Sequence, residues 1–506
     1  MLARKLMEGA TRVDALELDP ALNRLPPHPA SVHLIGICGT AMGALAGMLK
    51  KRGFSVTGSD ANVYPPMSDF LAEMNIPVRQ GYAPDNLAHN PDLVVVGNVV
   101  TRQNPEAAAL ADRGLCYLSL PQTLYHLFLK NKNPLVVTGT HGKTTTAALA
   151  AWLLEAAGAD PGFLIGGILK NFGSNHRLGG GDWFVVEGDE YDTAFFDKGP
   201  KFLHYAPRIA VLTSLEFDHA DIFPSLNEIR QAFRALVGLL LATGLLVACG
   251  DDPEVKTLAA EAPCPVRLYG LKHENAWRAV DLTPSGRETR FRLLRPGRPP
   301  LDLTTPLAGA HNVANTLAAL AALDGIGLEA ERLAEPLTRF QGVKRRQEVR
   351  GVHAGVTVLD DFAHHPTAVR ETLAAIRGAY PARRLVAVFE PRTNTSRRNV
   401  FQHDYAAAFD HADLVLIREA PGLEKIPPGE RFSSAQLVKD LNARGRSAFY
   451  FPDTDRLLAD LAGRLQSGDV VLIMSNGGFD GLHERLLADL AQRDKGQAGE
   501  AAPLPR

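Results

Sequence analysis

Cysteine is scarce in this sequence, and long apolar runs are missing. The 506 residues include four cysteines, none of them in a Cys-x-x-Cys pair, so we do not expect a disulfide framework. Residues 1–23 carry charges throughout and lack the apolar segment of a signal peptide. The longest apolar stretch, Ala235–Ala248, is interrupted by glycines and a threonine and is too short to span a bilayer. These absences argue against a secreted or membrane-bound protein and predict a cytoplasmic one.

No charge of one sign dominates the sequence either. Lys and Arg together number 54 and Asp and Glu 56, which leaves a net charge of -2. A chain so balanced is not expected to bind nucleic acid or an anionic membrane through its overall charge. The composition is 45% hydrophobic and 22% charged, as in ordinary globular proteins, and the length suits two to four domains. A multidomain enzyme is the simplest interpretation.

Short β-rich runs alternate with Ala/Leu-rich helical patterns from about residue 31 onward. This alternation predicts α/β layers with mainly parallel sheets. A polar break at 131–134 and a second break at Gln341-Gly342 divide the chain into three expected α/β domains, 1–132, 133–342 and 343–506. The stretch 274–303 alternates less regularly and suggests a small antiparallel sheet, and the polar tail 493–506 is expected to be frayed.

Several strands and helices have clear expected limits. The strand runs are Ser31–Gly36, Ser55–Asp60, Asp92–Gly97, Leu135–Thr138, Trp183–Glu187, Ile209–Ser214, Leu245–Cys249, Val356–Asp361, Arg384–Phe389, Leu414–Ile417 and Val470–Met474. The helical patterns are Met42–Arg52, Thr144–Ala157 and Asn312–Leu323. The motifs with chemical potential follow these strands or open these helices.

The sharpest local signal is the run LVVTGTHGKTTT at 135–146, in which a strand leads into a glycine loop and then a helix. Glycines let backbone N–H groups turn toward phosphate oxygens, and the helix N-terminus adds partial positive charge. Lys143 can reach the terminal phosphates of a nucleotide, and the Thr144 hydroxyl can bind Mg²⁺. Only two residues separate Gly139 from Gly142, where the standard motif has four. ATP is expected to contact Gly139, Thr140, His141, Gly142, Lys143, Thr144 and Thr145.

Acidic residues follow the next predicted strand in the run EGDEYD at 187–192, and EFDHAD at 216–221 follows the strand after that. Open α/β sheets bind ligands at the carboxyl ends of their strands, so these residues should lie near the glycine loop. Oxygen ligands suit Mg²⁺. We therefore expect a magnesium site that combines Thr144 with acids of the first run, and a metal or phosphate role for His219.

Two further segments leave alternatives open. Asn312 and Asn315 share one helix face, and their amides suit an adenine edge or a phosphate, whereas Asn312 alone could simply cap the helix. The loop 36–43 follows the first strand but does not match GxGxxG, so by itself it could bind NAD or another diphosphate.

Together these motifs resemble the Mur ligase family of ATP-dependent amino-acid and peptide ligases, over about residues 32–487. They occur in the family's order: the 36–43 loop, GTHGKTTT (139–146), EGDEYD (187–192), EFDHAD (216–221), HNVAN (311–315), Arg345-Arg346 and DDFAHHP (360–366). The resemblance implies a Rossmann-like N-terminal domain that binds a UDP-sugar and a P-loop ATPase-like central domain. It also implies a Rossmann-like C-terminal domain that binds a peptide and closes over the site.

The resemblance also implies a reaction. The carboxylate of UDP-N-acetylmuramate attacks the γ-phosphorus of ATP, and an incoming amine then attacks the acyl phosphate to form an amide of peptidoglycan. In the branch that adds L-alanine, a His-Arg pair follows a proline, whereas this chain has Arg392-Thr393. The stretches 58–67, 194–198, 216–223, 390–395 and 474–479 resemble the branch that adds L-alanyl-γ-D-glutamyl-meso-diaminopimelate, the murein tripeptide. That tripeptide is the expected nucleophile, in peptidoglycan recycling, and L-alanine is the alternative.

The resemblance further implies residue roles. Lys143 bridges the β- and γ-phosphates, Thr144 and Glu187 hold one Mg²⁺, and His219 helps to hold a second. The residues expected at the nucleotide from later in the chain are Asn312, Asn315, Arg346 and Asp361, with Arg346 arriving from the third domain. The expected catalytic residues are Lys143, Glu187, His219 and Arg346. The expected UDP-sugar residues are Gly36, Gly39, Thr40 and Asp60, and the expected peptide residues are Arg392, Ser475 and Asn476.

Three rival interpretations remain at this point. An NAD-dependent dehydrogenase would use the loop 36–43 but would leave the glycine loop at 139–142 without a role. A regulatory ATPase would need no UDP-sugar. His364-His365 could suggest zinc, but with no further Cys, His or acid cluster evident nearby we interpret the pair as a structured interdomain motif. A monomer or weak homo-oligomer is expected.

Overall fold

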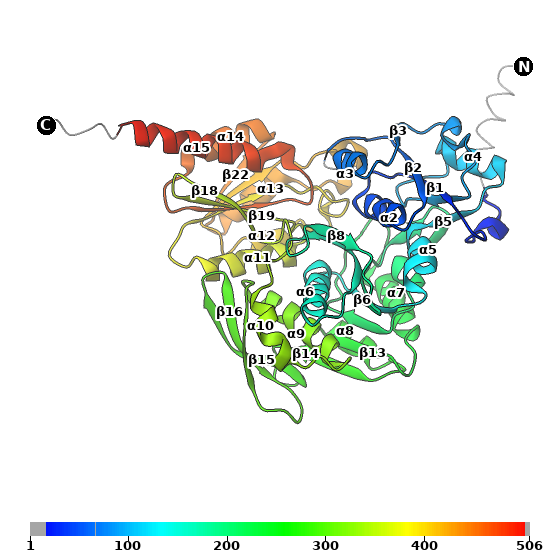
Figure 1. Ribbon diagram of the computed structural model, residues 1–506. Helices are drawn as coiled ribbons and strands as arrows, with labels where there is room; N and C mark the ends of the chain where they lie inside the picture. The colour runs from blue at the N-terminus through cyan, green and yellow to red at the C-terminus, as the bar shows by residue number, and fades with distance from the viewer. Residues whose placement is uncertain (1–16, 66, 501–506) are drawn as a thin grey trace, which may run out of the picture.

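Three sheets follow one another along the chain (Figure 1). The computed structural model describes residues 17–65 and 67–500, with side chains up to residue 494. The expectation about a signal peptide concerns residues 1–23, of which 1–16 lie outside the described part. Within the described residues, no helix is long and apolar enough to cross a membrane.

The N-terminal sheet is fully parallel, with the strand order β3-β2-β1-β4-β5. Its strands are β1 (Ser31–Ile35), β2 (Ser55–Asp60), β3 (Val78–Gln80), β4 (Leu93–Val96) and β5 (Tyr117–Ser119). Its helices are α2 (Thr40–Lys51), α3 (Met67–Glu73), α4 (Pro105–Arg113) and α5 (Leu120–Leu124). Gly39 caps α2 in an extended conformation, so the helix begins two residues earlier than expected and directly after the first glycine loop.

The central sheet has ten strands in the order β17-β16-β15-β14-β13-β12-β6-β9-β7-β8. The strands are β6 (Asn133–Thr138), β7 (Gly162–Leu169), β8 (Ser174–Arg177), β9 (Trp183–Gly188), β12 (Ile209–Leu212), β13 (Leu245–Cys249), β14 (Val266–Gly270), β15 (Trp277–Ser285), β16 (Glu288–Leu294) and β17 (Leu301–Thr305). The helices are α6 (Lys143–Ala156), α7 (Leu226–Gly238), α8 (Pro253–Ala259), α9 (Ala310–Asp324) and α10 (Ala330–Thr338), and β10 (Asp192–Ala194) pairs separately with β11 (Asp197–Pro200). Strand β6 lies between β9 and β12, parallel to both, so the three strands that precede the phosphate, acidic and histidine motifs are neighbours.

The stretch 274–303 does not form a separate sheet, contrary to our expectation. Its strands β15, β16 and β17 are antiparallel to one another, but β15 joins β14 in parallel and so extends the central sheet. Trp277, which opens β15 opposite Tyr269, is 5% exposed and belongs to the same apolar core as the parallel strands. Continuity of that core explains the single sheet.

The C-terminal sheet has the order β18-β19-β23-β20-β21-β22, and only β18 is antiparallel. The strands are β18 (Glu348–His353), β19 (Val356–Asp361), β20 (Leu385–Phe389), β21 (Leu414–Arg418), β22 (Ser447–Phe451) and β23 (Val470–Met474). The helices are α11 (Pro366–Ala379), α12 (Asp404–Ala408), α13 (Ser434–Ala443), α14 (Thr454–Arg464) and α15 (Leu482–Glu500). The expected frayed tail is thus wrong for 493–500, which continue α15, and 501–506 lie outside the described residues.

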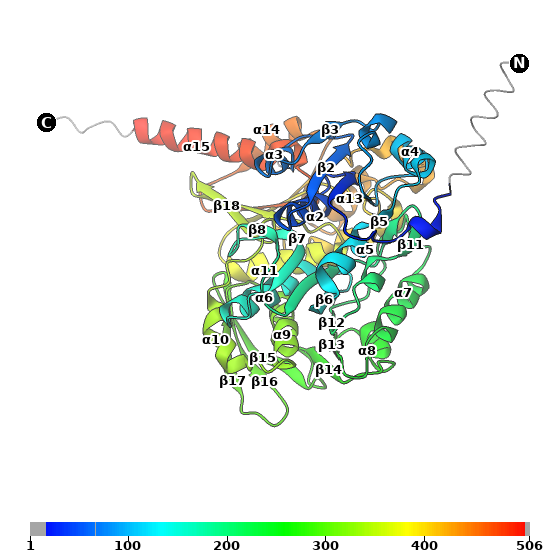
Figure 2. The same ribbon diagram turned by 45° about the vertical axis from the view of Figure 1, so that its right-hand side comes forward.

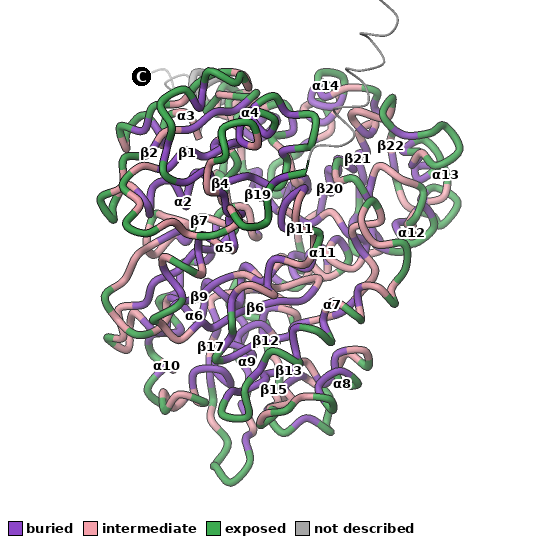
Figure 3. The backbone as a smooth tube through the Cα atoms, turned by 90° about the vertical axis from the view of Figure 1, so that its right-hand side faces the viewer, coloured by how far each residue is buried: buried purple, intermediate pink, exposed green. Residues whose placement is uncertain are grey.

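The N-terminal and C-terminal sheets lie on the same side of the central sheet (Figures 1 and 2). Phe70 of α3 packs its ring edge against His176 of β8, with 5.6 Å between ring centroids. The C-terminal part also contacts the central sheet: Leu169, at the end of β7, forms an antiparallel bridge with Val343, just before the C-terminal sheet. Buried residues run along the sheet strands in Figure 3, and exposed ones gather in outer loops. The carboxyl ends of the central strands therefore lie where all three parts meet.

Candidate active site

The glycine loop occupies the four residues between β6 and α6. Gly139 has φ +123° and Gly142 has φ +82°, both in the region that favours glycine. A Cβ on Gly139 would lie 2.3 Å from Thr213 Oγ1, and one on Gly142 would lie 2.4 Å from Asn315 Oδ1. Both the backbone conformation and the space therefore require glycine, and the loop presents the N-terminus of α6 as a site for an anion.

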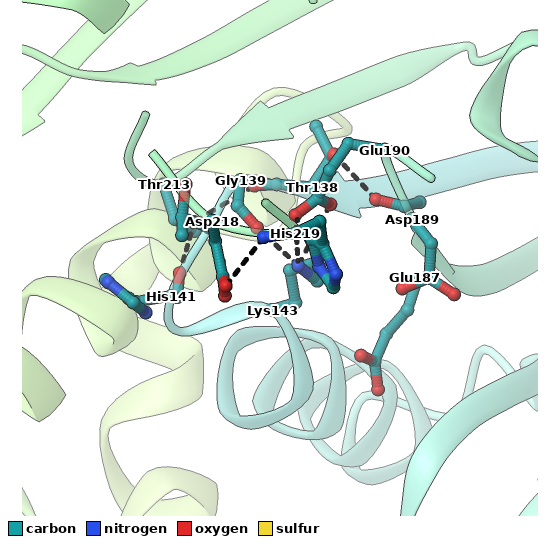
Figure 4. A network of polar contacts seen from close by, with 12 residues as sticks. Thr138, Gly139, His141, Lys143, Glu187, Asp189, Glu190, Thr213, Asp218 and His219 are labelled. Carbon is teal, nitrogen blue, oxygen red and sulfur yellow. Dashed lines mark hydrogen bonds and ion pairs between the residues drawn. The ribbon is translucent and has the colours of Figure 1, made fainter. Parts of the chain in front are cut away.

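Lys143, the first residue of α6, has its amino group inside the loop (Figure 4). Its Nζ donates to Gly139 O at 2.6 Å and to Glu190 Oε2 at 3.1 Å. Burial opposes the charge of Lys143, but Glu190, Asp189 and Glu187 raise its pKa above the ordinary value. A fixed cation therefore stands where a nucleotide's terminal phosphates would meet the helix.

Carboxylates from the end of β9 surround this cation. Glu187 accepts hydrogen bonds from Thr144 Oγ1 at 3.0 Å and from the N–H of Gly166 at 2.6 Å. Burial, together with the charge of Asp189, raises the pKa of Glu187. Asp189 in turn pairs with Lys201 Nζ at 3.0 Å. Thr144 and Glu187 thus present hydroxyl and carboxylate oxygens side by side, a donor set that fits Mg²⁺.

His219 reaches the same group of acids from the loop after β12. Its Nε2 lies 3.5 Å from Glu190 Oε1, its φ is +54°, and its ring lies 5.0 Å from that of Tyr191. Burial lowers the pKa of His219, but Glu190 and Asp218 raise it more, so the net shift is upward. The structure thus joins His219 to Lys143 through Glu190, a residue that we did not single out from the sequence.

The two asparagines of α9 lie beneath the loop and are almost fully buried. Asn315 Oδ1 accepts from Thr146 Oγ1 at 3.3 Å, and Asn315 Nδ2 donates to Asn312 Oδ1 at 3.2 Å. Asn312 Nδ2 donates to Ala308 O at 2.8 Å. The pair therefore supports Gly142 and α6, and in this arrangement its amides are engaged within the protein.

The adjacent Arg345 and Arg346 point to different partners. Arg345 Nη2 donates to the carbonyls of Ser475 and Gly477, at 2.6 and 2.7 Å, and so braces the C-terminal sheet. Arg346 Nη2 lies 3.3 Å from Thr144 Oγ1 and so reaches the glycine loop. Asp361, buried at the end of β19, accepts from the N–H groups of Gln347 and Ala363, and burial raises its pKa.

The residues predicted for the peptide share a carboxylate that sequence reasoning missed. Glu390 is fully buried, accepts from Ser475 Oγ at 2.6 Å, and lies 3.6 Å from Arg392 Nη1. Arg418 Nη1 pairs with the same carboxylate at 2.5 Å. Asn476 Oδ1 is buried without a hydrogen-bond partner among the described residues. Two signals in the sequence could have drawn attention to Glu390: it directly follows a predicted strand, and it opens the 390–395 stretch.

The first glycine loop leads from β1 directly into a helix. Gly36 has φ +82°, and Thr40 is the first residue of α2. Asp60, at the end of β2, accepts from the N–H of Cys38 at 2.9 Å and so holds the loop from within. Gly36, Gly39, Thr40 and Asp60 therefore lie around the loop that leads into α2.

The premise that no further His or acid cluster lies near His364-His365 is wrong. An acid and a histidine do lie next to His365: its Nδ1 is 3.5 Å from Glu216 Oε2, and His141 Nε2 is 3.2 Å from the same oxygen. The sequence could not indicate this cluster, because its members lie in three separate segments. The packing of the C-terminal part against the central sheet brings them together.

Comparison with family models matches three consecutive parts of the chain. The Mur ligase family, catalytic domain model covers residues 31–132, the Mur ligase middle domain model covers 137–323, and the Mur ligase, glutamate ligase domain model covers 345–477.

Individual relatives extend this likeness over nearly the whole chain. The UDP-N-acetylmuramate–L-alanyl-γ-D-glutamyl-meso-2,6-diaminoheptandioate ligase of Escherichia coli K12 is 42% identical over 464 residues, which cover 91% of this chain and 98% of that protein. The UDP-N-acetylmuramate–L-alanine ligase of Symbiobacterium thermophilum is 36% identical, covering 88% and 92%. The crystal structure of a murein peptide ligase from Psychrobacter arcticus 273-4 matches with a TM-score of 0.69 and 35% identity, covering 91% and 99%.

Proposed function

The chain belongs to the Mur ligase family and is an ATP-dependent ligase, and we propose that it joins UDP-N-acetylmuramate to L-alanyl-γ-D-glutamyl-meso-diaminopimelate. The observation that carries the choice of nucleophile is the group of Arg392, Arg418 and Glu390 at the carboxyl ends of β20 and β21. Arg418 is paired with both Glu390 and Asp480, whereas Arg392 lies 3.6 Å from Glu390 and is 42% exposed, so the guanidinium of Arg392 is the one left for a ligand. A tripeptide with several carboxylates uses such a group better than free L-alanine does.

The relatives favour the same choice. The tripeptide ligase of Escherichia coli is 42% identical to this chain, against 36% for the alanine ligase of Symbiobacterium thermophilum. L-alanine remains the second candidate nucleophile, because both kinds of ligase align with most of the chain. A dehydrogenase or a regulatory ATPase has no support in a family of ligases.

We assign one substrate to each of the three parts of the chain. Residues 1–132 bind the UDP-sugar, with its diphosphate at Gly36, Gly39 and Thr40 and its uridine near Asp60. Residues 133–342 bind ATP through the glycine loop, with Asn312 and Asn315 on the nucleotide side. Residues 343–506 bind the peptide through Arg392, Ser475 and Asn476, and they deliver Arg346 and Asp361 to the nucleotide.

Catalysis then depends mainly on position and charge. The sugar carboxylate attacks the γ-phosphorus of ATP, ADP leaves, and the peptide amine displaces phosphate from the acyl phosphate. Lys143 leaves Glu190 to meet the β- and γ-phosphates, and Arg346 adds positive charge from the third domain. Thr144, Glu187 and His219 would hold Mg²⁺, which when bound neutralises charge between the phosphates and the attacking carboxylate. A reaction that consumes ATP and a UDP-sugar belongs in the cytoplasm.

The test is phosphate release from ATP in the presence of UDP-N-acetylmuramate and a panel of amines. The proposal expects release that requires both the UDP-sugar and the tripeptide. Release without any UDP-sugar would contradict ligase activity, and equal release with every amine would contradict a dedicated peptide site.

A further inference from the structure

A cluster of two imidazoles and a carboxylate lies beside the glycine loop but outside the proposed magnesium site. His141 belongs to the loop, Glu216 follows β12, and His365 precedes α11 of the C-terminal part. One ligand atom from each lies within 4.8 Å of the others. The side chains are 23%, 37% and 6% exposed, so an ion could enter from the side of His141 and Glu216.

Two of the three spacings, those to Glu216, match a tetrahedral metal ion, and the third is within 4.8 Å. A four-coordinate Zn²⁺ with ligands at about 2.0–2.1 Å has its ligand atoms about 3.3–3.4 Å apart. Glu216 Oε2 is 3.2 Å from His141 Nε2 and 3.5 Å from His365 Nδ1. Two histidines and one glutamate, with a fourth position left for water, form a known zinc ligand set.

Neighbouring groups hold His365 and Glu216 in place by hydrogen bonds, as the residues around a metal site commonly do for its ligands. His365 Nε2 lies 3.3 Å from the carbonyl of Phe217, which places a proton on Nε2 and leaves the Nδ1 lone pair toward Glu216. Thr367 Oγ1 donates to Glu216 Oε2 at 2.8 Å and fixes the carboxylate. The N–H of Thr367 also approaches His365 Nδ1, at 3.2 Å, and this weak helix-capping contact is the one a metal would replace.

The protonation states of two members agree with this geometry. Contacts with His141, Thr367 and His365 outweigh burial and lower the pKa of Glu216 to about 2. Burial lowers the pKa of His365 to about 4. Both groups are therefore unprotonated at neutral pH, as metal ligands must be.

We propose that His141, Glu216 and His365 bind one Zn²⁺ or similar transition-metal ion, which joins the glycine loop to the start of α11. The site differs in chemistry from the magnesium site, because two nitrogens and one oxygen favour a borderline ion over Mg²⁺. A metal bound there would link the central part to the C-terminal part next to the nucleotide. The inference does not depend on which amine the enzyme uses.

Equilibrium dialysis of the full chain against Zn²⁺, with excess Mg²⁺ and no nucleotide, tests the site. The parent should bind one Zn²⁺ per chain with saturation. Glu216→Gln keeps the shape and an acceptor, and His365→Asn keeps a helix cap, so both variants should fold while binding Zn²⁺ at least about tenfold more weakly. Glu187→Ala, a variant of the magnesium site, should keep the zinc stoichiometry.

Two additional measurements make the test specific. His273→Ala removes an exposed imidazole that pairs with Glu274 and serves as the control for surface binding, so its zinc affinity should equal the parent's. Co²⁺ bound to the parent should give the strong visible absorption of a tetrahedral complex, and Zn²⁺ should displace it. Unchanged affinity in both site variants, loss of binding in Glu187→Ala, or no saturable binding to the parent would overturn the proposal.

Discussion

Arg346 lies across the boundary between the central and C-terminal sheets from Thr144, with Nη2 3.3 Å from Oγ1. Thr144 also donates to Glu187, so one hydroxyl connects a residue of the C-terminal part to the acids of β9. This contact gives a physical basis for coupling between the two parts. Movement of the C-terminal part would remove a guanidinium from the nucleotide site, so phosphoryl transfer should require closure.

Lys143→Ala should reduce turnover by more than tenfold, since the loss of a cation at the transferring phosphoryl group should cost more than about 1.4 kcal/mol of transition-state stabilisation. The structure adds a second effect. Glu190 is 3% exposed and would keep only His219 as a partner, so the variant should also melt at a lower temperature.

The measurements are steady-state phosphate release and thermal unfolding, with Lys198→Ala as the control. Lys198 is 70% exposed and pairs with Asp192 at the surface, so its removal should leave both values near the parent's. Turnover of Lys143→Ala within about tenfold of the parent would contradict a catalytic role.

Glu187→Ala and His219→Ala should each raise the Mg²⁺ concentration needed for half-maximal activity and lower the maximal rate. Glu187 lies at the end of β9 and contacts Thr144 directly, and His219 reaches the same acids from the loop after β12. A magnesium titration of phosphate release measures the effect, with Glu288→Ala, at an exposed position of β16, as control. A titration that is unchanged in both variants would remove them from the metal site.

Arg392→Ala should raise the KM for the tripeptide far more than the KM for ATP. Arg392 is half-exposed and tethered to Glu390, which leaves most of its guanidinium free for a ligand carboxylate. Arg398→Ala is the matched control, because Arg398 lies on the same loop but pairs with Glu430. Equal changes in both KM values, or equal effects of the two variants, would argue against a peptide contact at Arg392.

The stability of the protein should fall as the pH drops below about 6.5, in part through His176. Burial lowers the pKa of His176 from 6.5 to about 4, so between these values the unfolded chain binds a proton that the folded chain does not. This group should therefore remove about 1–2 kcal/mol of stability between pH 7 and pH 5.

His176→Gln should reduce the loss, as measured by urea unfolding at both pH values. Other buried histidines act in the same direction, so the comparison is between the parent and the variant. His273→Ala, at an exposed position, should show the parent's pH dependence. An identical pH dependence in parent and His176→Gln would contradict the assignment.

The sequence predicted best those strands that are buried on both faces. The limits of β13, β19 and β23 agree with expectation, because each is a short apolar or β-branched run between turn residues. The limits of β2 agree as well, although Ser55 is exposed. Strand β22 was missed since Ser447 and Tyr450 lie exposed at the sheet edge and break the apolar pattern. The antiparallel edge strands β15–β17 were placed in a separate sheet because no local signal shows that β15 pairs with β14.

The site was predictable where a motif follows a strand, and not where packing joins distant segments. The loop 139–142 and the acids after β9 follow that rule. The contact of Glu390 with Arg418 joins two strands of the C-terminal sheet, and that of Glu216 with His365 joins two parts of the chain. Such pairs depend on strand order and on the docking of the sheets, which no local pattern contains.

The choice of nucleophile tests the central claim most directly. We would measure kcat/KM for the murein tripeptide and for free L-alanine with the parent enzyme, at saturating ATP and UDP-N-acetylmuramate. The account predicts a kcat/KM for the tripeptide well above that for L-alanine. A higher kcat/KM for L-alanine would contradict it and would make the chain a UDP-N-acetylmuramate–L-alanine ligase.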